Sequence, residues 1–124
     1  MASIVMVVDD SATVRLQAGR ALTQAGFEVV EAVDGIDALE KLEARRDIGL
    51  IVCDVNMPRM NGVEFVEALA KRPGWKPPVI MLTTEGHPQL IQRAKASGAK
   101  GWMIKPFKPE ILVAAAKKLA VVAA

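Results

Sequence analysis

The chain has 124 residues, of which 52% are hydrophobic and 24% charged, and its formal net charge is +2. This length and composition predict one globular domain and exclude disordered and collagen-like chains, while the small net charge gives no indication of nucleic-acid binding. A single cysteine, a single histidine and no long apolar run exclude an internal disulfide, a Cys/His zinc site, a signal peptide and a membrane helix, so a cytoplasmic location without membrane insertion is expected.

Short apolar runs alternate with helical patterns along the whole chain. In chain order they predict a strand at 4–8, a helix at 12–25, a strand at 27–32, a helix at 36–44, a strand at 50–53, a helix at 62–71, a strand at 79–82, a helix at 88–97, a strand at 101–104 and a helix at 109–121. Ser11 and Asp34 are expected to cap the first two helices. Gly26 should end the first helix, and Pro109 should open the last.

The predicted strands are continuous apolar runs, which is typical of a parallel sheet covered by helices on both faces. Right-handed crossovers between them give an α/β fold with a doubly wound sheet. The order 2-1-3-4-5 would place the first and third strands side by side. In such sheets, ligands bind beyond the carboxyl ends of the strands at this switch point.

Polar residues follow four of the five predicted strands: Asp9 and Asp10 the first, Asp54 the third, Thr83 the fourth and Lys105 the fifth. All four strand ends border one crevice in this order. Three carboxylates alone would repel one another, and a hard cation such as Mg²⁺ relieves that repulsion while bridging carboxylates to phosphate. Lys105 adds a positive charge and Thr83 a hydroxyl donor, both suited to a phosphoryl group.

Asp54 is the best candidate for the reacting group. A carboxylate is ionised at neutral pH and needs no general base to attack phosphorus, so the expected product is an aspartyl phosphate. Asp54 is a lone acid in the middle of the sheet, whereas the adjacent pair Asp9 and Asp10 suits a metal anchor. Mg²⁺ and Lys105 would neutralise charge on the phosphoryl oxygens during transfer.

Four segments of the chain closely resemble the receiver domain of two-component response regulators, in the order and at the spacing of that family. They are Asp9-Asp10-Ser11, the stretch DVNMPRMNG at 54–62, the stretch MLTTE at 81–85, and Lys105-Pro106-Phe107. The resemblance covers the whole chain. It implies the flavodoxin-like (CheY-like) three-layer sandwich, for which 2-1-3-4-5 is the known strand order, and a receiver domain spanning 1–124 without an output domain.

The resemblance implies a role for each matching residue. Asp54 would accept the phosphoryl group from a sensor histidine kinase, a histidine phosphotransfer protein or a small phosphodonor. Asp9, Asp10, Asp54 and the backbone carbonyl of Asn56 would hold Mg²⁺. Lys105 would pair with Asp54 and then with the phosphoryl oxygens. The domain would promote only its own phosphorylation and dephosphorylation, and would not otherwise be an enzyme.

The resemblance also implies a switch and its tuning. Thr83 would shift toward the phosphoryl group, and Asn56 and Glu85 occupy positions where the family tunes dephosphorylation. The peptide bond between Lys105 and Pro106 is commonly cis in the family. Trp102 stands at the aromatic switch position, where the family usually has Tyr or Phe. Together with the Thr83-Thr84-Glu85 run and the expected absence of an output domain, Trp102 makes the chain most similar to the stand-alone, chemotaxis-type branch.

The predicted output surface comprises the segments 88–97, 101–104 and 109–121. Residues 86–124 contain seven Lys or Arg residues and Glu110 as the one acid. This excess indicates either an acidic surface on a protein partner or simply a solvated basic helix face. Without an output domain, DNA is not expected as a partner. Substitution of Lys100 or Lys117 should weaken binding of that partner. The protein is expected to be a monomer.

Two other functions fit parts of the pattern less well. A Mg²⁺-dependent phosphohydrolase of the haloacid-dehalogenase type has its nucleophile on the first strand and a second Asp two residues later, whereas Asp54 follows the third strand and precedes Asn56 by two. A nucleotide or flavin carrier needs a phosphate-binding loop after the first strand, where Asp9 and Asp10 would repel phosphate. A degenerate receiver remains an alternative, although every acceptor-site residue is present.

Overall fold

The structure is a computed structural model that describes residues 3–45, 47–57, 59–74, 76–83 and 88–120. Strands and helices alternate from end to end, as the sequence predicts. The elements are β1 (Ile4–Val8), α1 (Ala12–Gln24), β2 (Glu28–Ala32), α2 (Gly35–Ala44), β3 (Ile48–Asp54), α3 (Gly62–Ala70), β4 (Val79–Thr83), α4 (Pro88–Ala96), β5 (Gly101–Ile104) and α5 (Pro109–Leu119).

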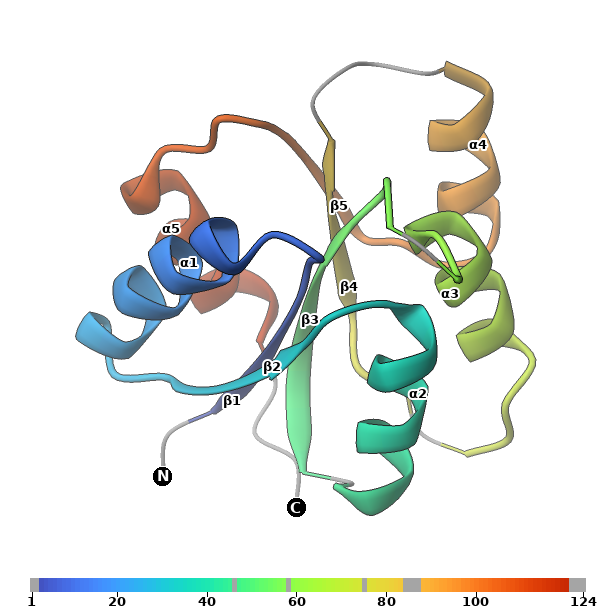
Figure 1. Ribbon diagram of the computed structural model, residues 1–124, viewed down its shortest axis with the longest axis horizontal. Helices are drawn as coiled ribbons and strands as arrows, with labels where there is room; N and C mark the ends of the chain where they lie inside the picture. The colour runs from blue at the N-terminus through green and yellow to red at the C-terminus, as the bar shows by residue number, and fades with distance from the viewer. Residues whose placement is uncertain (1–2, 46, 58, 75, 84–87, 121–124) are drawn as a thin grey trace.

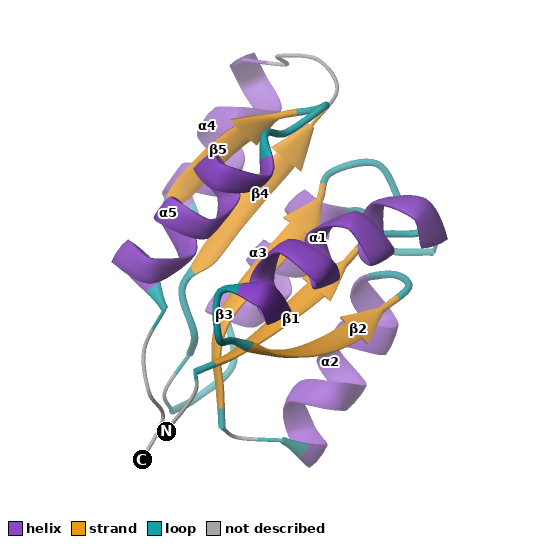
Figure 2. Cartoon of the chain, turned by 90° about the vertical axis from the view of Figure 1, so that its left-hand side faces the viewer, coloured by secondary structure: helices purple, strands orange, loops and turns teal. Residues whose placement is uncertain are grey.

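The five strands form one parallel sheet in the order β2-β1-β3-β4-β5, which confirms the predicted topology. Helices α1 and α5 cover one face, and α2, α3 and α4 cover the other (Figure 1). Figure 2 shows the sheet face-on, with α1 and α5 in front of it and α2, α3 and α4 behind it. No helix in the described ranges has both the length and the apolar character to span a membrane.

Alternate residues of each strand point into two separate cores. On β1, Val5 and Val7 pack with Leu22 of α1 in the core beneath α1 and α5. Met6 and Val8 instead belong to the core beneath α2, α3 and α4. Because β1, β3 and β4 are buried over their whole length, both faces are apolar, and this explains the continuous apolar runs in the sequence.

The predicted boundaries differ from the observed ones at several strand ends. Asp54 and Thr83 are the last residues of β3 and β4 rather than the first residues beyond them. The third strand starts at Ile48, which pairs with Ile4 of β1, and not at position 50. The second strand begins at Glu28 rather than at position 27. Pairing with neighbouring strands sets these limits, and a single segment of sequence does not carry that information.

Candidate functional site

The strand register brings the predicted site residues to one edge of the sheet. Val8 of β1 lies opposite Cys53 of β3, so the next residues, Asp9 and Asp54, are neighbours. Thr83 of β4 lies opposite Ile104 of β5, and the Lys105 amide donates to the Thr83 carbonyl at 2.7 Å. The side chains of Asp9, Asp54 and Lys105 continue the alternation that points toward the α1 and α5 side.

Three carboxylates form a compact oxygen cluster. One carboxylate oxygen from each of Asp9, Asp10 and Asp54 lies within 4.8 Å of the others. Asp9 and Asp54 are buried, whereas Asp10 is exposed, so the cluster opens to solvent on one side. Oxygen ligands that retain access to water match the preference of Mg²⁺, which keeps several water ligands. The donor set therefore fits a hard divalent cation.

Lys105 reaches into this cluster from the end of β5. Its ammonium Nζ lies 2.7 Å from Asp9 Oδ2 and 3.0 Å from Asp54 Oδ1. The Lys105 side chain is only 13% exposed, and those of Asp9 and Asp54 are 1% and 6% exposed, so these pairs are largely shielded from water. The peptide bond between Lys105 and Pro106 is cis, as the family resemblance implies.

Burial and charge act in opposite directions on the site. Burial, assisted by the neighbouring charge of Asp9, raises the pKa of Asp54 above its usual value, although the hydrogen bond from Lys105 opposes the shift. Burial also disfavours the charge on Lys105, but hydrogen bonds to Asp9 and Asp54 outweigh it and raise the pKa of the ammonium. Lys105 therefore carries its positive charge at neutral pH.

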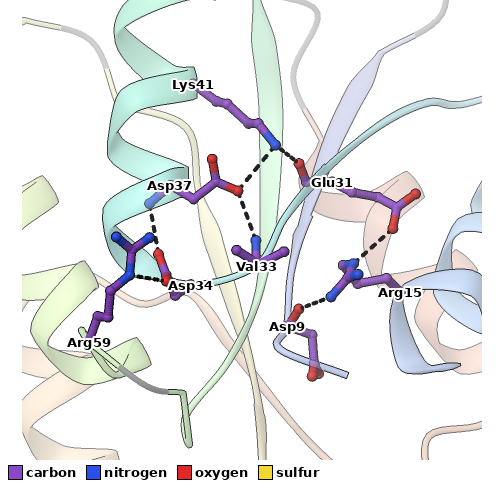
Figure 3. Close-up of polar contacts among 8 residues, drawn as sticks. All are labelled: Asp9, Arg15, Glu31, Val33, Asp34, Asp37, Lys41 and Arg59. Carbon is purple, nitrogen blue, oxygen red and sulfur yellow. Dashed lines mark hydrogen bonds and ion pairs between the residues drawn. The ribbon is translucent and has the colours of Figure 1, made fainter. Parts of the chain in front are cut away.

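Asp9 is held in place from two sides. The Ser11 amide donates to Asp9 Oδ1 at 2.9 Å. Arg15 of α1 donates through Nη1 to the Asp9 carbonyl at 2.7 Å and through Nε to Glu31 of β2 at 2.9 Å (Figure 3). Our sequence analysis missed Arg15, and its place on the first turn of a helix after the acidic pair is the only signal that could have indicated it.

The loop between β3 and α3 closes tightly against Asp54. The Gly62 amide donates to the Val55 carbonyl at 2.9 Å, and a Cβ atom on Gly62 would lie 2.1 Å from the Asp54 carbonyl oxygen. Asn61 caps α3 in a reciprocal arrangement with Glu64. Asn56, the second residue of this loop, is exposed and follows Asp54 by two positions.

Thr83 and Trp102 lie on the opposite side of the sheet from Lys105. Thr83 is buried and follows Met81 by two residues on β4, and Met81 pairs with Trp102 of β5. Trp102 packs against the core beneath α2, α3 and α4. Its indole nitrogen is buried and has no hydrogen-bond partner in the described part of the chain. The two candidate switch residues therefore lie on the same face of the sheet.

Glu85 is the predicted site residue that lies outside the described residues, as do the neighbouring Thr84 and His87. The other predicted residues lie at the carboxyl edge of the sheet or on β5 beside it. Sequence reasoning also missed Arg59, whose side chain reaches Asp34 across the β2–α2 and β3–α3 loops. No local sequence pattern predicts that contact, because 25 positions separate the two residues.

Comparison with known proteins agrees with this geometry. A family model described as the response regulator receiver domain matches residues 5–117. The chain is 39% identical over 109 residues to chemotaxis protein CheY1 of Helicobacter pylori (86% of this chain, 88% of the relative). It is 39% identical over 113 residues to a probable chemotaxis protein CheY of Rhizobium etli (90% and 87%). The solved structure of chemotaxis response regulator CheY4 of Vibrio cholerae superposes with a TM-score of 0.88 at 42% identity, covering 96% of this chain and 99% of that one.

Proposed function

This chain belongs to the family of response regulator receiver domains, which are signalling domains of two-component systems, and we propose that it accepts a phosphoryl group on Asp54. The observation that carries the proposal is the pairing of a buried carboxylate with a buried ammonium at 3.0 Å beside two further acids. Phosphorylation would then change the affinity of the domain for a partner protein.

In the proposed reaction, a carboxylate oxygen of Asp54 attacks the phosphorus of the donor. The bond from phosphorus to the imidazole nitrogen of a phosphohistidine breaks, and the electron pair leaves with the imidazole. A carboxylate attacks through an oxygen lone pair, so Asp54 needs no general base. The hydrogen bond from Lys105 opposes the rise in the Asp54 pKa that burial causes. Lys105, already in contact with Asp54, would then contact the oxygens of the transferred phosphoryl group.

Asp9, Asp10, Asp54 and the backbone carbonyl of Asn56 would hold Mg²⁺. When bound, the ion supplies positive charge beside the oxygens of the phosphoryl group. Asp9 meanwhile keeps its position through the Ser11 amide and Arg15. Asn56, an exposed residue, would affect access of water to the phosphorylated Asp54, and Glu85 is proposed to do the same.

The switch is proposed to pass through Thr83 and Trp102. A phosphoryl group on Asp54 would draw the Thr83 hydroxyl toward it as a hydrogen-bond donor. Movement of Thr83 changes the packing beside Trp102, whose buried indole N–H lacks a partner among the described residues. A buried N–H without a partner is stabilised when it forms a hydrogen bond. This stabilisation favours a rearranged Trp102 in the phosphorylated state.

The proposed output surface is formed by α4, β5 and α5. Ile104 and Ile111 are 62% and 51% exposed there, and Lys100 and Lys117 are also exposed. This mixture of apolar and basic side chains suits an acidic protein partner. Because the named relatives are chemotaxis proteins, we place that partner in chemotaxis or motility signalling, and we propose a cytoplasmic monomer without further enzymatic activity.

Reaction with small phosphodonors tests the proposed function. Incubation with an acyl phosphate and Mg²⁺ should add one phosphoryl group per chain, as measured by intact mass, and omission of Mg²⁺ should prevent the gain. A phosphomonoester should not be consumed. Continuous release of phosphate from the monoester would instead support the phosphohydrolase alternative.

A further inference from the structure

We propose that Asp34 and Arg59 form a latch that positions the β3–α3 loop for cation binding beside Asp54. The inference rests on the proposed function and assigns Arg59 as a positioning residue within it. The latch joins two loops that follow neighbouring parts of the sheet edge, since Asp34 precedes α2 and Arg59 precedes α3.

The Asp34 carboxylate uses its two oxygens for two different purposes. Oδ1 accepts a hydrogen bond from the Asp37 amide at 2.8 Å and caps α2. Oδ2 accepts a hydrogen bond from Nε of Arg59 at 2.6 Å. The Asp34 side chain is 4% exposed, and the hydrogen bond from Arg59 is the main cause that holds its pKa below the usual value. The hydrogen bond that caps α2 therefore fixes the Asp34 carboxylate in position, and Arg59 binds to this fixed acceptor.

Arg59 makes this contact from an unusual backbone conformation. Its φ is +62°, and it is the one residue other than glycine with positive φ in the described ranges. A side chain disfavours this left-handed region, so a contact outside the residue must stabilise it. The ion pair with Asp34 is such a contact (Figure 3).

Gly35 and Met60 also join the two loops, and a further hydrogen bond closes the β3–α3 loop on itself. The Gly35 amide donates to the Met60 carbonyl at 3.3 Å, and a Cβ atom on Gly35 would lie 2.7 Å from Met60 Cγ. At the far end of the loop, the Gly62 amide is bonded to Val55 beside Asp54. Asn56 lies between Asp54 and Arg59, so the latch restrains the segment that bears its carbonyl.

The same chain of polar contacts continues toward Asp9 (Figure 3). Asp37 accepts from Lys41 at 3.2 Å, and Lys41 also donates to the Glu31 carbonyl. The Glu31 side chain pairs with Arg15, which donates to the Asp9 carbonyl. The loop and the first acidic ligand are thus joined to one polar framework around β2 and α2.

Calorimetric titration with Mg²⁺ tests the latch without requiring phosphorylation. Arg59→Ala should weaken Mg²⁺ binding about tenfold, the scale expected when a group that orients a metal ligand is removed. Asp34→Asn should have a similar effect, because its amide oxygen can still cap α2 while its amide nitrogen faces Arg59. The double variant should lose no more than either single variant, because the two residues act as one unit.

Two controls separate the latch from general effects on folding. Arg72→Ala removes an arginine that donates to the Leu39 carbonyl and pairs with Glu43 at the other end of α2, and it should leave Mg²⁺ affinity unchanged. Arg59→Gly permits the left-handed backbone without a side chain, and it should lose as much affinity as Arg59→Ala. Phosphoryl acceptance by Arg59→Ala should recover to within about twofold of wild type at saturating Mg²⁺, because the deficit lies in cation affinity.

The latch is refuted if Arg59→Ala binds Mg²⁺ like the wild type, if Arg59→Gly does so, or if the two single losses add in the double variant. Equal loss in Arg72→Ala refutes it as well. Failure of the proposed function gives a different result, in which wild-type protein binds Mg²⁺ but gains no phosphoryl group.

Discussion

Replacing Lys105 with alanine should slow phosphoryl acceptance from an acyl phosphate by about 100-fold at saturating Mg²⁺, the scale of losing one group that stabilises charge on the transferred oxygens. The side chain contacts both Asp9 and Asp54 within 3.0 Å, and both contacts raise its pKa. Because the Lys105 ammonium is already beside Asp54 before the donor binds, it can stabilise charge on the phosphoryl oxygens without rearrangement. Mass spectrometry over a time course measures the rate.

The same substitution should destabilise the protein in the absence of Mg²⁺ by about 3 kcal/mol, because it leaves two buried carboxylates without their cation. Added Mg²⁺ should restore part of that stability in thermal unfolding. Lys108→Ala is the matched control, because Lys108 is exposed, belongs to the same loop and makes no side-chain cap to α5. A Lys105→Ala protein with wild-type rate would contradict the proposed role, whatever its stability.

Replacing Gly62 with alanine should destabilise the fold by about 3 kcal/mol and lower the melting temperature by about 10 °C. The added Cβ would lie 2.1 Å from the Asp54 carbonyl oxygen and 2.9 Å from Met81 Cε. The methionine methyl can move, but the carbonyl belongs to the last residue of β3. Relief of the clash must therefore displace Asp54 or open the start of α3, and phosphoryl acceptance should fall with stability.

Gly19→Ala provides the matched control for that substitution. Gly19 lies inside α1, and a Cβ there meets Val29 Cγ1 at an ordinary 3.8 Å. Alanine is favoured over glycine inside a helix, so this variant should be more stable by about 0.5–1 kcal/mol. Thermal unfolding of both variants decides the point, and equal stability of Gly62→Ala and wild type would refute the close packing against Asp54.

The fold was predictable because its signals are local and repeat along the chain. Runs such as Ile4–Val8 are apolar throughout because both faces of β1 are buried, and this property alone indicates a covered parallel sheet. The convergence of Asp9, Asp54 and Lys105 then follows from topology, since parallel strands end at the same edge. The alternation of side chains along each strand adds to this convergence, because all three side chains point to the face covered by α1 and α5.

The remaining parts of the site depend on contacts between distant segments. Arg59 pairs with Asp34 across 25 positions. Its left-handed backbone could not be predicted from the residue type, because arginine does not favour positive φ. The sequence marked Gly62 as the start of a helix and the end of the DVNMPRMNG stretch, but the need for glycine there arises from the carbonyl of Asp54. Such close approaches are set by packing in three dimensions, so spacing and composition could not indicate them.

The role of Asp54 as phosphoryl acceptor is tested most directly by the intact mass of wild-type protein and Asp54→Ala after incubation with an acyl phosphate and Mg²⁺. We predict that the wild type gains one phosphoryl group, that the gain requires Mg²⁺, and that Asp54→Ala gains none. The same gain in Asp54→Ala would place the acceptor elsewhere and contradict the account. No gain in a wild type that binds Mg²⁺ would also contradict it and favour the degenerate-receiver alternative.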